Sequence, residues 1–204
     1  MSTTPATLPV LLPWLQTLLA AWLLAGCAAN PVTGKSDYVL MSEQQEIALG
    51  QRYNREILKE MPAYDDAKLN AMIQSIGDKL AAHSHRTSLD YRFTVVDSPT
   101  VNAFALPGGY IYITRGMLAY LNSEAELAAV LGHEIGHVTA RHSVRQHSAQ
   151  TTASVLGTVV SVATGIGGVD DLTDMAGTAI VRGYGREHEL EADRLCAKYM
   201  ARSG

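Results

Sequence analysis

The sequence predicts an α+β domain that is mostly helical and contains a small antiparallel sheet or hairpin. Segments with apolar residues at helical spacing lie before residue 84 and after residue 123. Between them the pattern changes to the alternation of strands, and a Pro-Gly-Gly turn separates two short segments of this kind. The 204 residues are enough for one domain with one substantial core.

The composition excludes several other classes of protein. Charged residues make up 18% of the chain, which contains only two cysteines. These values exclude collagen, a coiled coil, a disulfide scaffold and an acidic disordered tail. A net charge of −4 gives no basic surface for a polyanion, so we expect no nucleic acid among the partners.

The N-terminal region predicts a lipoprotein signal peptide over residues 1–26. Residues 8–25 are uncharged, and the sequence Leu-Ala-Gly-Cys at 24–27 resembles a bacterial lipobox, which implies a lipid on Cys27. An uncleaved N-terminal anchor is the alternative, and both interpretations place the rest of the chain outside the cytoplasm. Ala28 resembles the residue that keeps lipoproteins in the outer membrane, so we expect attachment to its inner face, in the periplasm.

Two helices and three strands are expected next. Residues 27–40 contain Asn, Pro, Thr, Gly and Ser and predict a lipidated tether or a loosely docked arm. The predicted helices cover residues 41–60 and 66–83, and two histidines that end or follow the second are expected to be solvated, His83 and His85. Strands are predicted over 91–96 and in a tight hairpin, where 102–105 and 110–114 flank Pro107, Gly108 and Gly109.

A long helix should begin at the capping box of residues 123–126 and continue to about Gln150. A stripe of small residues along it indicates close approach of another element, which the sequence does not identify: Ala128, Gly132, Gly136 and Ala140. Residues 153–169 are apolar but contain four glycines, so we expect buried packing rather than a lid or a membrane-facing surface. Residues 172–203 return to helical spacing, and Cys196 is expected to be a small buried hydrophobe.

A metal-binding motif, HEIGH, begins at His133 within the long helix. Histidines four positions apart lie on one face of a helix, so His133 and His137 can both reach one zinc ion. Glu134 lies one step round the helix, where it can act on a water molecule. His142 and His147 do not continue this spacing from His137, and we expect them to face solvent.

The third ligand is expected among the carboxylates of residues 187–193, because zinc hydrolases take three protein ligands. Helical geometry places Glu187 and Glu191 on a charged stripe suited to solvent, whereas Glu189 and Asp193 share a stripe that is otherwise apolar. An inward carboxylate without a partner is costly, and a metal ion removes that cost. We therefore expect Glu189 to be a ligand and Asp193 to orient a ligating histidine.

At these residues the sequence resembles the zinc metallopeptidase family of HtpX, the CAAX prenyl endopeptidases, BepA and LoiP. The resemblance extends from about Met41 to the end of the chain. It includes the Asn-Ala-Phe-Ala segment, the two glycines of the hairpin, the HEIGH helix and the Glu-x-x-x-Asp pair. The lipobox favours the periplasmic lipoprotein branch, which contains BepA and LoiP.

The resemblance implies a zincin-like (gluzincin) metalloendopeptidase domain over residues 41–204 with one Zn²⁺ per chain. His133, His137 and Glu189 would bind the zinc, and Glu134 would be the catalytic base. A hydrogen-bond donor to the oxyanion is also expected, which could be His188, Tyr184 or a residue of a missing C-terminal part. The hairpin would supply an edge strand for an extended polypeptide substrate, at Asn102, Ala103, Phe104, Gly108 and Gly109.

The expected function is hydrolysis of unfolded or misassembled proteins of the cell envelope. The main alternative is a chaperone-like factor for outer-membrane protein assembly, in which client binding outweighs proteolysis. A third interpretation makes zinc a structural clip between two helices. The family pattern normally continues past the Glu-x-x-x-Asp helix, sometimes into a tetratricopeptide domain, so we expect the domain to be incomplete at its C-terminus.

Overall fold

The computed structural model describes residues 27–164 and 184–204. The expected signal peptide over 1–26 lies outside the described residues. Within the described part of the chain, no helix combines the length and the apolar character needed to cross a membrane.

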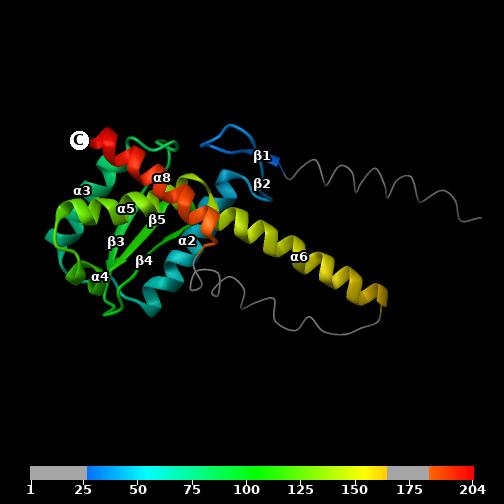
Figure 1. Ribbon diagram of the computed structural model, residues 1–204. Helices are drawn as coiled ribbons and strands as arrows, with labels where there is room; N and C mark the ends of the chain where they lie inside the picture. The colour runs from blue at the N-terminus through cyan, green and yellow to red at the C-terminus, as the bar shows by residue number, and fades with distance from the viewer. Residues whose placement is uncertain (1–26, 165–183) are drawn as a thin grey trace, which may run out of the picture.

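The fold is a small sheet enclosed by helices, with one long helix, α6, extending from the body (Figure 1). The helices are α2 Glu43–Glu60, α3 Ala67–Ala81, α4 Arg115–Tyr120, α5 Glu124–Thr139, α6 His142–Thr164 and α8 Arg186–Ser203. The strands are β1 Cys27–Ala29, β2 Ser36–Tyr38, β3 Arg92–Val96, β4 Ala103–Leu106 and β5 Tyr110–Thr114.

The main sheet has the order β3-β5-β4 and is mixed, whereas the sequence predicted an antiparallel sheet. The hairpin of β4 and β5 is antiparallel, as expected, but β3 pairs with β5 in parallel. The reason is the position of β4 at the edge of the sheet farther from β3. The chain passes from β3 to β4 and then turns back into β5 between them, so β5 runs in the same direction as β3. A short 3-10 turn joins the hairpin strands, with Gly108 at φ 77° and Gly109 at φ 93°.

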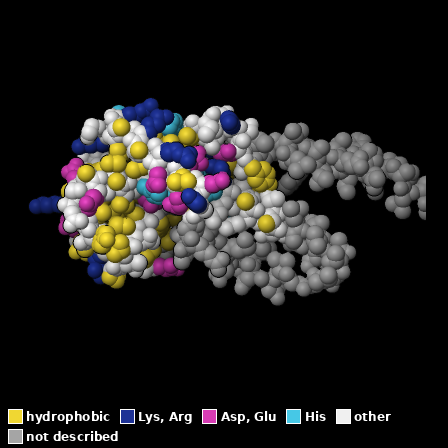
Figure 2. All heavy atoms as spheres, viewed as in Figure 1, with side chains coloured by type: hydrophobic (Ala, Val, Ile, Leu, Met, Phe, Trp, Pro, Cys, Tyr) yellow, Lys and Arg dark blue, Asp and Glu magenta, His cyan; other side chains and the backbone are white. Residues whose placement is uncertain are grey.

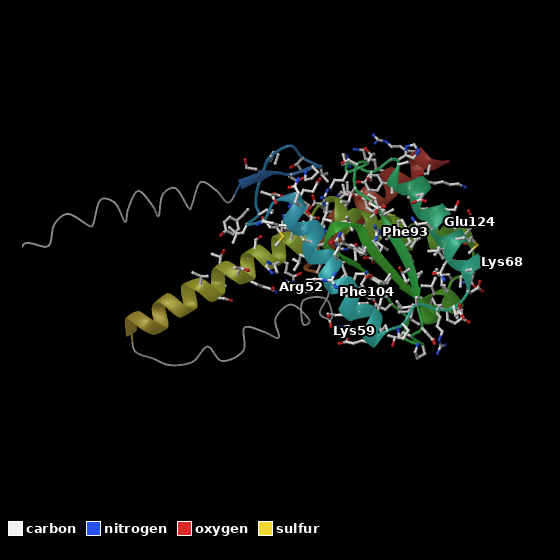
Figure 3. The ribbon with its side chains drawn as sticks, turned by 180° about the vertical axis from the view of Figure 1, so that it is seen from behind. Arg52, Lys59, Lys68, Phe93, Phe104 and Glu124 are labelled. Atoms are coloured by element: carbon white, nitrogen blue, oxygen red, sulfur yellow. The ribbon has the colours of Figure 1, made fainter. Side chains whose placement is uncertain are left out.

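Alternate side chains of the strands point to opposite faces of the sheet, and helices cover both faces. On one face, Phe104 and Tyr112 stack with ring centroids 4.9 Å apart and pack with Tyr53 and Ile57 of α2. Figure 3 shows α2 crossing the sheet beside Phe104. The opposite face packs against α3, α5 and α8 in the larger core. Six residues of that core are completely buried: Ile73, Val95, Leu131, Ile135, Ala140 and Tyr199.

The outer edge of β3 is closed by side-chain amides of α3. The Gln74 amide accepts a hydrogen bond from the Phe93 N–H at 3.0 Å and donates one to the Tyr91 carbonyl at 3.0 Å. Asn70 accepts one from the Val95 N–H at 3.2 Å. β4 forms the other edge of the sheet.

The long helix predicted to reach about Gln150 is instead two helices. α5 ends at Thr139, Arg141 adopts a left-handed conformation with φ 56°, and α6 begins at His142. The Arg141 guanidinium donates to the buried Glu46 carboxylate at 2.9 Å and to the Met41 carbonyl at 3.2 Å. This tertiary contact offsets the cost of the unusual backbone conformation.

The segment expected to be a tether is held against α6. Its strands β1 and β2 form an antiparallel hairpin in which Cys27 lies opposite Tyr38. The Tyr38 and Thr152 hydroxyls share a hydrogen bond, and the Leu40 N–H donates to the Ser148 hydroxyl at 3.0 Å. The arm is therefore folded and docked more firmly than its composition indicates.

The expectation of buried packing for residues 153–169 is wrong at the described start of this stretch. Ala153 is exposed, and the Val155 side chain lies on the surface of α6 with 58% of its area accessible. Residues 165–169 lie outside the described residues.

Candidate metal centre

Three side chains with metal-ligating atoms converge where α8 crosses α5. His133 and His137 project from one face of α5, and Glu189 reaches them from the first turn of α8. The two histidine Nε2 atoms are 2.9 Å apart, and Glu189 oxygens lie 3.3 Å and 3.8 Å from them. Tetrahedral zinc with bonds of about 2.0–2.1 Å separates its ligand atoms by about 3.3 Å. These residues therefore fit the ion that the motif implies.

The small-residue stripe of α5 explains how α8 comes so close. A Cβ atom added to Gly136 would lie 2.9 Å from the Ala192 carbonyl oxygen and 3.0 Å from its Cα atom. One added to Gly132 would lie 3.1 Å from the Cys196 sulfur. The unidentified neighbour of the stripe is thus α8, and the glycines allow it to present Glu189 to the histidines.

Asp193, one turn beyond Glu189, contacts a histidine of the centre, but it does not face inward as its stripe predicted. Its Oδ1 atom is 2.9 Å from Nδ1 of His133, the ring nitrogen that faces away from the other ligands. This contact can fix the orientation of the His133 ring. The Asp193 side chain remains 65% exposed, so the contact lies at the rim of the centre.

His142 is completely buried, which contradicts the expectation that it faces solvent. Its Nδ1 atom lies 2.9 Å from Nδ1 of His137, and its Nε2 atom lies 3.1 Å from Glu191. Glu191 was also expected on a solvated stripe, but it is half-buried between His142 and Arg145. The break after α5 turns the start of α6 back toward the ligands, and no local signal in the sequence marks that break.

Glu134 is buried beside the ligands, with 7% of its surface accessible. Burial raises the pKa of Glu134 to about 8, and the negative charge of Glu189 adds to this rise. A bound cation would act in the opposite direction, because it stabilises the carboxylate. Glu134 is thus a group whose proton affinity depends on the metal.

The two expected oxyanion donors also adjoin the centre. The Tyr184 ring stacks on His137 with centroids 4.1 Å apart, and its hydroxyl shares a hydrogen bond with Ser143. Burial raises the pKa of Tyr184 to about 12. His188 stacks on His142 at 4.3 Å, and burial lowers its pKa. Both rings therefore pack against the histidines, and the Tyr184 hydroxyl already has a partner.

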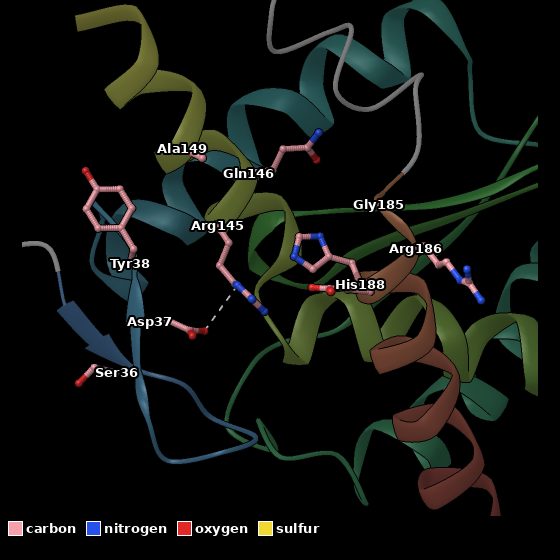
Figure 4. Close-up of a pocket in the computed structure, with 10 residues that line it drawn as sticks. Ser36, Asp37, Tyr38, Arg145, Gln146, Ala149, Gly185, Arg186 and His188 are labelled. Atoms are coloured by element: carbon pink, nitrogen blue, oxygen red, sulfur yellow. Dashed lines mark ion pairs between the residues drawn. The ribbon is translucent and has the colours of Figure 1, made fainter. Parts of the chain in front are cut away.

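The surroundings of the centre are strongly polar. Histidine and acidic side chains gather at the middle of the face shown in Figure 2. Beside them lies a pocket of about 600 Å³ between β2, α6 and the start of α8. Figure 4 shows His188 and the ion pair of Arg145 with Asp37 in its lining.

His83 and His85 differ in exposure, and most of the residues expected to form the substrate edge strand are buried. His83 is exposed, as expected, whereas His85 is half-buried, with Nδ1 2.8 Å from the Tyr199 hydroxyl. Phe104 packs inside the core, and Gly108 and Gly109 are buried in the turn.

The sequence of this chain is similar to that of known metallopeptidases. The family model described as peptidase family M48 matches residues 67–204. The beta-barrel assembly-enhancing protease of Yersinia pestis is 33% identical over 184 residues, which cover 85% of this chain and 38% of that protein. The Arabidopsis thaliana mitochondrial metalloendopeptidase OMA1 is 31% identical over 147 residues, covering 72% of this chain and 30% of that protein. The chain thus spans well under half the length of these relatives.

Proposed function

The chain belongs to peptidase family M48, and from this premise we propose that it is a zinc-dependent metalloendopeptidase of the bacterial cell envelope. The observation that carries the proposal is the convergence of His133, His137 and Glu189 beside the buried Glu134. Only three protein side chains form this group among the described residues, which leaves a zinc ion room for substrate and favours catalysis over a structural clip. We accordingly assign a zincin-like fold to residues 41–204.

In the proposed peptide hydrolysis, the zinc ligands, Glu134 and Asp193 have separate roles. A bound zinc ion would supply Lewis-acid chemistry by polarising a carbonyl group or a water molecule. The Glu134 carboxylate accepts a proton from the attacking water and delivers it to the leaving amine. Asp193 holds the His133 ring in the orientation that directs its Nε2 atom toward the other ligands.

The substrate backbone would pair with the outer edge of β4. The Thr114 N–H donates to the Asn102 carbonyl at 3.0 Å, so these two residues form a hydrogen-bonded pair of the hairpin. In an antiparallel ladder such pairs alternate, which directs the backbone groups of Ala103 and Ala105 away from β5. An extended peptide can bond to the backbone of Ala103, which is half-buried, whereas Ala105 is buried and Phe104 and the turn glycines support the strand from within.

The substrates we propose are unfolded or misassembled outer-membrane proteins. The name of the bacterial relatives, beta-barrel assembly-enhancing protease, supports this class. We further propose that residues 1–26 are removed and that a lipid on Cys27 anchors the protein in the periplasm, at the inner face of the outer membrane. The firmly docked β1–β2 hairpin would then hold the domain close to the lipid.

The test is the Glu134→Gln variant, compared with Glu124→Gln at an exposed position of the same helix. Glu134→Gln should lower kcat for an unfolded polypeptide by about 10²–10⁴-fold, because it removes the general base. The zinc content of both variants should remain one ion per chain. Undiminished cleavage by Glu134→Gln would contradict the mechanism.

The same variant separates the proposal from a chaperone-like function. If client binding outweighs proteolysis, cells that carry only Glu134→Gln will still assemble their outer-membrane proteins. If hydrolysis is the function, those cells will accumulate misassembled clients as a deletion strain does.

A further inference from the structure

His142, the first residue of α6, connects a proposed metal ligand on α5 to an ion pair between Glu191 of α8 and Arg145 of α6. We propose that His142, Glu191 and Arg145 form a hydrogen-bonded relay that fixes the ring of His137 and thereby sets the metal affinity of the centre. This inference rests on the proposed metal site. It assigns a positioning role to three residues that the HEIGH and Glu-x-x-x-Asp motifs do not include.

The contacts of the relay are continuous. Nδ1 of His137 lies 2.9 Å from Nδ1 of His142, whose Nε2 atom lies 3.1 Å from the Glu191 carboxylate. The Arg145 guanidinium donates to the same Glu191 oxygen at 3.3 Å. Both histidine rings are buried, with 2% and 0% of their surface accessible. Water therefore does not replace these hydrogen bonds, and each ring depends on its protein partners.

The two histidines can satisfy all these contacts in only one arrangement of hydrogens. Nε2 of His137 faces His133 and Glu189, so a metal ligand needs its lone pair there and its hydrogen on Nδ1. That Nδ1–H donates to Nδ1 of His142. The remaining hydrogen of His142 is then on Nε2 and donates to Glu191. The relay therefore selects the tautomer of His137 that binds metal through Nε2.

Arg145 ties the end of the relay to a third part of the fold. It lies between Glu191 and Asp37 of β2, with its Nε atom 3.7 Å from the Asp37 carboxylate (Figure 4). Arg145 supplies a charge partner for the half-buried Glu191 carboxylate. Each ligating histidine is thus oriented by an acid of α8, His133 directly by Asp193 and His137 through His142.

The experiment measures the zinc dissociation constant of the full chain, by competition with a chromophoric chelator. His142→Ala should weaken zinc binding by about 10–100-fold, the range found when outer partners of metal ligands are removed. His142→Asn should restore part of this loss, because its amide oxygen can accept from His137. His147→Ala, a change of another histidine on α6, should leave the affinity unchanged. Glu191→Gln should cause a smaller loss, since it keeps an acceptor without the charge.

A spectroscopic measurement separates positioning from general loosening of the fold. In the cobalt-substituted protein, the visible absorption of His142→Ala should change in position or intensity, while His147→Ala keeps the spectrum of the unchanged protein. If His142→Ala does not fold, as judged by circular dichroism, His142→Asn and Glu191→Gln provide the same comparison.

The relay and the proposed function fail in different ways. Wild-type zinc affinity and cobalt spectra in His142→Ala, or in both substitute variants if it does not fold, would overturn the relay and leave the peptidase proposal intact. A relay-dependent zinc affinity in a chain that cleaves no polypeptide would support the relay and overturn the proposed function.

Discussion

The surroundings of Cys196 lower the reactivity of its thiol. The residue is 8% exposed, and its thiol donates to the Ala129 carbonyl at 3.2 Å, in the contact between α5 and α8. Burial raises the pKa of the Cys196 thiol, and the nearby Asp193 charge adds to the rise. The thiolate is the reactive form of cysteine, so this position suits packing rather than nucleophilic chemistry.

We therefore predict that Cys196 reacts slowly with a thiol reagent in the folded protein. In a Cys27→Ser background, modification by a disulfide reagent at pH 8 should be more than about 100-fold slower in buffer than in guanidinium chloride. Stopped-flow absorbance gives both rates. Equal rates in the two solutions would show that the thiol is accessible and reactive in the native state.

Residue patterns predict the part of the site that is local in sequence. His133 and His137 are one helical turn apart, so their common face follows from helix geometry alone. His142 is different, because its position depends on the break at Arg141. That break depends on a contact with Glu46, which lies 95 residues away in the chain. No local pattern contains this information.

At the scale of elements, the approach of α8 to α5 depends on two glycines with different neighbours. Gly136 faces the backbone of Ala192, whereas Gly132 faces the side chain of Cys196. A backbone atom cannot move without shifting its helix, but a side chain can change its rotamer. Substitution of the two glycines should therefore have unequal consequences.

Gly136→Ala should destabilise the fold and displace α8. The overlap should cost about 1–3 kcal/mol as overpacking does, against a gain of about 1 kcal/mol in helix propensity. Because α8 carries Glu189, zinc affinity should fall as well. Gly132→Ala is the matched control and should change both properties less. Urea unfolding and chelator competition measure the two effects, and a reversed ranking would contradict the packing argument.

The elements themselves were predicted better than their arrangement. The Pro-Gly-Gly turn predicts the β4–β5 hairpin because the information is local, and the helices α2 and α3 follow from their apolar spacing. The parallel pairing of β3 with β5 could not be predicted, since it depends on which edge β4 takes. The closure of the β3 edge by Asn70 and Gln74 is likewise a tertiary feature.

At the scale of the whole molecule, the buried carboxylate of Glu46 joins separate segments of the chain. It is 1% exposed and accepts hydrogen bonds from Arg86 at 2.7 Å and from Arg141 at 2.9 Å. Arg86 also donates to the Val138 carbonyl near the end of α5. The Gly108 N–H of the hairpin turn lies 3.4 Å from the same carboxylate. The Glu46 side chain thus links α2 to the hairpin turn and to the break between α5 and α6.

Glu46→Gln should destabilise the whole domain, because it leaves the buried Arg141 guanidinium without its counter-charge and leaves Arg86 with only the half-exposed Glu43. Removing one partner of a buried ion pair costs about 3–5 kcal/mol, which lowers the thermal midpoint by on the order of 10 °C. Zinc affinity should also fall, since Arg141 fixes the break that brings His142 to the ligands. Glu56→Gln, which removes the charge of an exposed pair with Lys59, should change stability by less than about 0.5 kcal/mol. Calorimetry of the metal-free proteins and chelator competition test both effects, and equal thermal midpoints for the two variants would contradict the role of Glu46.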